Sequence, residues 1–112
     1  MGTGTVSTAG FHMGMVFDSN VKRVFWYIFG GMRGGPTRVK IVKLLLAKPS
    51  NMNQIKTGLS LDYKTVQHHI KTLEENRIII SEEKKYGTIY FPSTLLQQNV
   101  QIFNEIAEKL KE

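Results

Sequence analysis

Residues 51–76 read NMNQIKTGLSLDYKTVQHHIKTLEEN, and they contain the clearest structural pattern of the chain. Its first half begins with a capping-box pattern made of Asn51 and Gln54, in which Asn takes the place of the usual Ser or Thr. A short helix should follow this pattern, and Gly58 is a natural residue to end it. The first half therefore predicts one short helix with a defined start.

The second half of the stretch predicts a longer helix after a tight turn. Asp62 is a good N-cap for this helix, and Asn76 can take the left-handed conformation that ends it. Because successive residues of a helix are about 100° apart, three apolar residues share its inward face. These inward residues are Val66, Ile70 and Leu73. Residues 51–75 therefore predict a helix–turn–helix motif.

A β-hairpin is expected directly after the second helix. Residues 78–80 are all isoleucine and begin a β-branched strand, and residues 88–91 alternate as the return strand. Between them, Glu82–Gly87 supplies a charged turn, in which Gly87 can adopt a positive φ. A wing hairpin over residues 78–92, placed after a helix–turn–helix, is the plan of a winged helix.

Two helices are expected upstream of the motif. Val16–Phe29 reads as an amphipathic helix that Gly30 and Gly31 end. A second helix should begin at Pro36, which suits the first helical position, and run to about Ala47. With the helix expected at the C-terminus, the fold class is α+β and mostly α, a winged helix–turn–helix with additional N-terminal and C-terminal helices.

The last helix, residues 93–111, is capped by Ser93 and carries an apolar seam with heptad-like steps. The first helix carries a similar stripe, and exposed stripes of this size usually mark an interface. We therefore expect a homodimer. Its interface residues are Phe17, Val21, Val24, Phe25, Ile28, Leu96, Val100, Phe103 and Leu110. The first helix has two alternative roles, core packing and membrane-surface contact, and we favour dimer contact or core packing.

A length of 112 residues indicates one domain, which we place at residues 16–112. Residues 1–15 are rich in Gly, Thr and Ser without periodicity, so we expect a disordered tail, in part vector-derived because His12-Met13 has the form of a cloning junction. The absence of cysteine excludes a disulfide scaffold, a thiolate zinc site and cysteine catalysis. No apolar run approaches the roughly 20 residues that span a bilayer. We expect a cytoplasmic protein.

The charge of the chain is strongly positive and uneven. Lys and Arg number 15 against nine Asp and Glu, which gives a net charge of +6. Val21–Leu73 holds ten of these cations and a single anion, Asp62. A basic centre of this kind indicates a polyanionic partner, and its alternative is a solvated helix surface.

The outward face of the second motif helix has the chemistry of a DNA reader. Its residues are Lys64, Thr65, Gln67, His68, Lys71 and Thr72. This face contains no carboxylate before Glu75, whereas most solvated helices mix Glu with Lys. Gln can pair bidentately with adenine, and Lys can reach the acceptors of guanine. The helix Asp62–Glu75 is therefore predicted to be a recognition helix in the major groove of double-stranded DNA.

The same residues resemble a known family. The segment LSLDYKTVQHHIKTLEENRII resembles the recognition-helix segment of ArsR-like winged helix regulators. More narrowly, the R-G-G-x-x-R start, the N-x-N-Q helix, the L-D-Y-x-T-V-x-H-H helix and the K-Y-G wing resemble archaeal winged helix regulators. The likeness covers roughly Gly30–Ser93 and implies a dimeric transcription factor.

The resemblance also implies which residues contact DNA. Base- and phosphate-reading positions fall on Lys64, Thr65, Gln67, His68 and Lys71, and wing positions fall on Lys84, Lys85 and Tyr86. Arg38, which closes the R-G-G-x-x-R start, completes the expected DNA-binding set. The wing, Lys84–Gly87, should lie at the flanking backbone or in a minor groove.

Other chemistries find little support in the chain. Metal sensing is not expected, because the recognition helix lacks cysteine thiolates and the adjacent His68 and His69 point about 100° apart. No phosphate-binding loop, carboxylate pair or Ser/His/Asp arrangement is recognisable, so we expect no enzyme, no cofactor and no obligate small molecule. The alternative to a DNA-binding regulator is a winged helix that binds proteins or a membrane surface without specific DNA binding.

Overall fold

The computed structural model describes residues 20–85 and 87–111. Its elements are η1 (Trp26–Gly31), α2 (Gly35–Ala47), β1 (Ser50–Asn51), α3 (Met52–Leu59), α4 (Tyr63–Glu75), β2 (Ile79–Lys84), β3 (Gly87–Pro92), α5 (Thr94–Gln98) and α6 (Val100–Leu110). Helices dominate over one small antiparallel sheet, which confirms the predicted fold class. The tail predicted for residues 1–15 lies outside the described residues, as do Phe17 and Tyr86.

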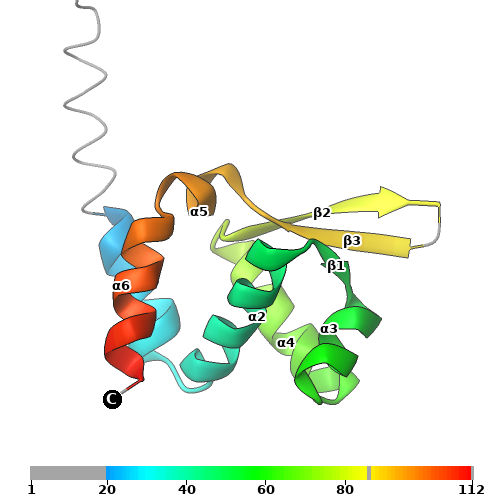
Figure 1. Cartoon of the computed structure of the whole chain (residues 1–112), viewed down its shortest axis with the longest axis horizontal. Coiled ribbons are helices and arrows are strands. Elements are labelled where there is room, and N and C mark those ends of the chain that lie inside the picture. Colours follow the sequence, from blue (N-terminus) through cyan, green and yellow to red (C-terminus); the bar gives the residue numbers. More distant parts are fainter. Residues whose placement is uncertain (1–19, 86, 112) are drawn as a thin grey trace, which may run out of the picture.

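The molecule has two distinct ends (Figure 1). At one end, α6 lies beside residues 20–31, and we call these two segments the terminal helix pair. At the other end, α3, α4 and the tip of the β2–β3 hairpin project from the body of the domain. The helix α2 lies between the two ends and contacts both η1 and α4. It therefore packs against elements of both ends.

The start of α3 follows the sequence prediction closely. The Asn51 side chain accepts a hydrogen bond from the Gln54 backbone N–H at 2.7 Å, and the Gln54 side chain accepts one from the Asn51 N–H at 2.8 Å. This reciprocal pair is a complete capping box. At α4, Asp62 occupies the predicted N-cap position with extended backbone, although its side chain makes no capping hydrogen bond.

The second motif helix ends at Glu75 as predicted, but the residue expected to take the left-handed conformation after each helix is wrong by one or two positions. Gly58 lies inside α3, and the left-handed residue that follows the helix is Ser60, with φ 56°. Gly58 serves close packing instead, because a Cβ there would lie 3.0 Å from Leu44 Cδ1 of α2. After α4, Asn76 has φ −98° and Arg77 takes the left-handed conformation with φ 60°.

The wing covers nearly the predicted residues, but its strands are longer and its turn is shorter than the sequence predicts. The strand β2 continues through Glu82 and Glu83 to Lys84, which pairs with Gly87 of β3, so the predicted six-residue turn is too long. A cross-strand hydrogen bond from the Thr88 hydroxyl to Glu83 Oε2, at 3.1 Å, accompanies this extended pairing. Gly87 adopts the predicted positive φ, at 123°. The short strand β1, which the sequence did not indicate, pairs with β3 and gives the sheet order β1-β3-β2.

The first helix ends at the second of its two glycines, two residues beyond the predicted Phe29. Residues 20–25 are α-helical, and the chain then widens into the π-helix η1, which includes Gly30 and Gly31. The Met32 N–H donates to the Tyr27 carbonyl at 3.0 Å, five residues back. A Cβ at Gly30 would lie 2.7 Å from the Trp26 ring. The glycine thus allows the backbone to turn closely around the indole, and this explains why it continues the helix.

The predicted last helix is two helices. Ser93 caps α5 as predicted, since its hydroxyl accepts the Leu96 N–H at 3.0 Å. The helical run then breaks at Asn99, with φ −122° and ψ 25°, before α6 begins. The break interrupts the heptad-like seam, so Leu96 and Phe103 belong to different helices.

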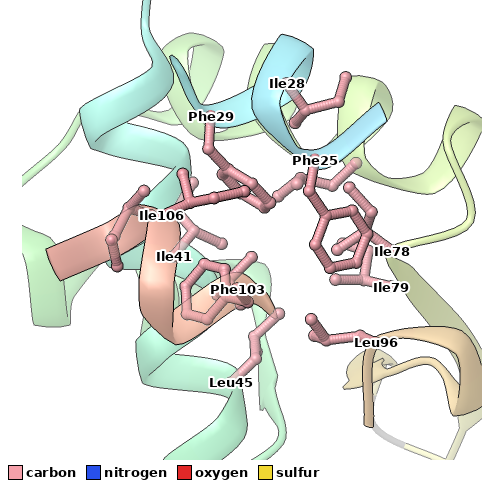
Figure 2. Close-up of a cluster of buried hydrophobic side chains, with 14 of the residues drawn as sticks. Phe25, Ile28, Phe29, Ile41, Leu45, Ile78, Ile79, Leu96, Phe103 and Ile106 are labelled. Atoms are coloured by element: carbon pink, nitrogen blue, oxygen red, sulfur yellow. The ribbon is translucent and has the colours of Figure 1, made fainter. Parts of the chain in front are cut away.

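A single hydrophobic core joins the two ends (Figure 2). Phe29 lies at its centre and makes edge-to-face contacts with Phe25 and Phe103, with ring centroids 5.8 and 5.1 Å apart. Four aliphatic side chains pack around these rings: Ile41 and Leu45 of α2, and Ile78 and Ile79 at the start of the wing. The core therefore holds the terminal helix pair against the winged helix.

This core corrects the expectation of exposed apolar stripes. Five of the expected interface residues are buried within one chain, namely Val21, Phe25, Ile28, Leu96 and Phe103. They are unavailable to a partner because the helices of the terminal pair and α5 bury them against each other and against α2. Val24 remains 37% exposed, and Val100 and Leu110 are half-buried. Within the described part of the chain, no helix has the length and apolar character needed to cross a membrane.

Candidate nucleic-acid interface

The helix α4 brings together most of the residues predicted to read DNA. Its inward side is buried through Val66, Ile70 and Leu73. On the opposite side, Lys64, Gln67, His68 and Lys71 are exposed, while Thr65 and Thr72 are half-buried. At about 100° per residue, the four exposed side chains fall within an arc of about 100°. The predicted reading face therefore exists as one continuous strip.

One exposed residue at this face was missed by the sequence prediction. Tyr63 is the first residue of α4 and is 53% exposed, directly before Lys64. An aromatic side chain with a hydroxyl at this position adds a flat surface and a polar group to the start of the strip. Helical periodicity gave no signal for it, because at 100° per residue Tyr63 falls about 20° from Ile70 and 60° from Val66, on the side that is buried further along the helix.

The wing is less basic than the prediction assumed. Lys84 Nζ forms an ion pair with Glu82 Oε1 at 2.8 Å, and both side chains are 52% exposed. Residues 82–85 contain two glutamates and two lysines, so their formal charges cancel. Lys85 is exposed, and the third predicted wing residue, Tyr86, lies outside the described residues. At the base of the wing, burial raises the pKa of the Tyr90 phenol.

Arg38 does not take part in this surface, which corrects the predicted DNA-binding set. Its side chain is fully buried, and its hydrogen bonds go to other parts of the protein. The cause is helical phase: Arg38 shares a face of α2 with Ile41, Val42 and Leu45, all of them completely buried. The spacing i, i+3, i+4, i+7 in the sequence was the signal that places it inward.

The two adjacent histidines of α4 have different surroundings. His68 is exposed, whereas His69 is only 6% exposed. Burial lowers the pKa of His69, and the positive charge of Arg38 and the neighbouring His68 lower it further. The ring centroids are 5.2 Å apart and the rings are tilted by 60°. Among residues 20–85 and 87–111, no group of three His, Asp or Glu side chains is placed to hold a metal ion.

The architecture places the protein in the class of winged helix–turn–helix domains: a capped helix pair, an outward polar strip on the second helix and an adjoining hairpin. Residues 35–81 match the family model described as bacterial regulatory protein, arsR family. This match runs from the start of α2 into β2. It confirms the resemblance to ArsR-like winged helix regulators. Such proteins are transcriptional regulators and not enzymes, as predicted.

Solved structures of regulators share the fold. The transcriptional regulator BldR from Sulfolobus solfataricus is 12% identical with a TM-score of 0.63, over 98% of this chain and 82% of that chain. The S. aureus MepR–DNA complex is 15% identical with a TM-score of 0.61, over 96% of this chain and 87% of that chain. A probable transcriptional regulator from Pseudomonas aeruginosa is 13% identical with a TM-score of 0.57, over 88% and 80%. A sequence search among curated proteins finds no match.

Proposed function

We propose that the protein is a sequence-specific transcriptional regulator that binds double-stranded DNA with α4 in the major groove. The observation that carries the proposal is the exposed strip of Lys64, Gln67, His68 and Lys71 on one face of a helix held by a buried opposite face. Gln and Lys are suited to adenine and guanine edges, and the lysines also neutralise phosphates. The ArsR-type helix–turn–helix and the DNA in the MepR complex support this function.

The β2–β3 hairpin is proposed to contact DNA beside the main site. It projects from the same end of the molecule as α3 and α4 (Figure 1). Lys84 and Lys85 at its tip supply positive charge for phosphates or a minor groove. Since Glu82 pairs with Lys84, this contact requires the ion pair to open or to share its lysine with phosphate. The wing should therefore contribute less than α4.

The protein is further proposed to act in the cytoplasm as a homodimer, through the residues of the terminal helix pair that the core leaves exposed. Val24 is 37% and Tyr27 61% exposed on the first helix. A groove of about 430 Å³ lies between the two helices of the pair and is lined by Lys22, Trp26, Glu105, Ile106, Glu108 and Lys109. A two-fold dimer would present two copies of α4 to half-sites about one DNA turn, roughly 34 Å, apart.

The first prediction tests the reading strip directly. A duplex with the preferred sequence is selected from a random library with the full chain, and its affinity is measured by fluorescence anisotropy. Gln67→Ala should weaken binding by about 1–3 kcal/mol and relax the preference at one base position, because one bidentate base contact is lost.

The matched control is Gln98→Ala, which makes the same change at an exposed position of α5, outside the strip, the wing and the terminal helix pair. It should leave both affinity and preference unchanged. If Gln67→Ala behaves like Gln98→Ala, α4 is not the reading helix. If no duplex is enriched at any salt concentration, the alternative of a protein-binding winged helix is favoured.

A further inference from the structure

A buried arginine connects the terminal helix pair with the recognition helix. Arg38, fully buried on α2, donates from Nε to the Ile28 carbonyl of η1 at 3.0 Å and from Nη2 to the Arg33 carbonyl at 2.9 Å. Its Nη1 lies 2.9 Å from Nδ1 of His69 on α4. We call these four residues the Arg38 network. One guanidinium thus makes hydrogen bonds to two backbone carbonyls at the end of η1 and to the His69 side chain of α4, the helix proposed to read DNA.

The chemistry of this contact determines the protonation state of His69. A guanidinium has five N–H donors, no acceptor and no accessible neutral form. Nδ1 of His69 must therefore be the acceptor, and a neutral imidazole then carries its proton on Nε2. An imidazolium has N–H groups on both nitrogens, so protonation would replace the hydrogen bond with two facing donors and two positive charges 2.9 Å apart. Proton binding and the Arg38–His69 hydrogen bond are mutually exclusive.

The groups around His69 do not stabilise its protonated form. A Cβ on Gly34 would lie 2.7 Å from His69 Cε1, so the loop backbone packs directly on the ring. The charged or titratable groups that act on His69 are the Arg38 guanidinium, on α2, and the His68 imidazole, on α4, and both disfavour a further positive charge. No ion pair within the described ranges joins a carboxylate to Arg38 or His69. The strain must therefore be relieved by movement of α4 or of the loop.

We propose that the Arg38–His69 hydrogen bond is a proton-sensitive link that holds α4 in its DNA-binding position, and that protonation of His69 releases it and weakens DNA binding. This inference rests on the proposed function, because its biological readout is DNA affinity. It also makes the loop between η1 and α2 a coupling element, since the same arginine holds the Ile28 and Arg33 carbonyls.

The direction of the pH effect follows from linkage. Burial lowers the pKa of His69 below its ordinary value of 6.5. In the DNA-bound state, where the link is intact, His69 excludes a proton more strongly than in the released state. Well above pH 6.5 both states are neutral at His69, so affinity is constant there. As the pH falls through 6.5 the released state gains protons, and affinity should fall by up to about tenfold per pH unit for each His69.

The first experiment needs no DNA, so it stands even if the proposed function fails. Long-range ¹H–¹⁵N NMR of the full chain at pH 7.5 should show the His69 proton on Nε2, and the ring should titrate below 6.5. The backbone amides of residues 28–34 should shift with the same midpoint as His69. A proton on Nδ1 at pH 7.5, or titration of His69 without a response in residues 28–34, would overturn the proposal.

The second experiment measures affinity for the selected duplex between pH 7.5 and pH 5.5, with circular dichroism to verify the fold. His69→Asn retains an acceptor near the Nδ1 position but cannot titrate, so its affinity should lose the acid-side decrease of the wild type. His68→Asn removes the neighbouring exposed histidine and should retain the decrease. Equal pH profiles for wild type and His69→Asn would refute the link, whereas absence of DNA binding at every pH would refute the proposed function alone.

Discussion

At the scale of single residues, Arg38 carries a full positive charge into the core without a carboxylate partner among the described residues. Its three acceptors are the carbonyls of Ile28 and Arg33 and the imidazole of His69. Hydrogen bonds make up for part of the lost hydration, and burial lowers the pKa of the guanidinium, which nevertheless stays charged. A residue that sequence reasoning assigned to DNA is thus a structural donor for three segments.

This role predicts a large loss of stability when Arg38 is removed. Arg38→Met should lower the free energy of unfolding by about 2–4 kcal/mol, because two buried acceptors and one part-buried acceptor lose their donor. Urea denaturation of both proteins at pH 7.5 measures the difference. Arg33→Met is the matched control, since the Arg33 side chain is exposed and only its carbonyl is used. It should change stability by no more than about 0.5 kcal/mol. Similar values for the two variants would contradict the network.

At the scale of elements, α3 and α5 are defined at their starts by side-chain hydrogen bonds, and α3 is defined at its end by packing. The capping box at α3 and the Ser93 cap at α5 are both formed. The end of α3 is set instead by Leu59, which packs against the core and extends the helix beyond Gly58. Starts are therefore easier to predict than ends.

The capping box at α3 yields a stability prediction. Asn51→Ala should lower the free energy of unfolding by about 1 kcal/mol, because it removes the side-chain acceptor of the Gln54 N–H. Asn53→Ala is the control, as Asn53 is exposed two residues further along and is not part of the box. Thermal unfolding of the two variants compares them at equal composition. A cost at Asn53 equal to that at Asn51 would show that the cap contributes nothing specific.

The wing hairpin yields a second prediction at this scale. Replacing Lys84 and Lys85 together by Ala should weaken binding to all duplexes alike and lower the slope of log affinity against log salt by about one per cation lost. Because Glu82 already neutralises Lys84, the decrease is expected to be below two per protomer. The control is the same double change at Lys40 and Lys43, two exposed lysines of α2 outside the reading strip, the wing and the terminal helix pair. An unchanged slope in the wing variant would mean that the wing points away from DNA.

At the scale of the whole molecule, the core joins the terminal helix pair to the winged helix in one unit. Phe103 of α6 packs on Phe29 and is completely buried. Phe103→Ala should therefore lower the free energy of unfolding by about 3–5 kcal/mol and is no test of dimer formation. A residue that the core leaves exposed, such as Val24, is the proper site for such a test.

The proposed homodimer predicts that Val24→Asp separates the subunits without unfolding them. A charge in an apolar interface loses its hydration without compensation, whereas at an exposed position of a monomer it costs little. Light scattering at micromolar concentration should give twice 12.8 kDa for the wild type and 12.8 kDa for the variant. Asn53→Asp, which places the same charge on α3, should remain dimeric. A wild-type protein that is monomeric at this concentration would remove the proposal.

The sequence alone was enough to predict the order of the main helices and the hairpin, the N-cap residues of α3, α4 and α5, the outward strip of α4 and the positive φ of Gly87. These features depend on groups only a few residues apart or on strict periodicity, and such patterns can be read directly from the sequence. The match over residues 35–81 rests on the same local pattern.

The tertiary structure alone decided which of the candidate surfaces remain free. Whether an apolar stripe is a dimer face or part of the core depends on what lies across from it, and here α6 and α2 cover the first helix. The break at Asn99 and the inward turn of Arg38 follow from the same packing. These outcomes depend on contacts between residues distant in sequence, such as Arg38 with His69, and local propensity carries no information about such contacts.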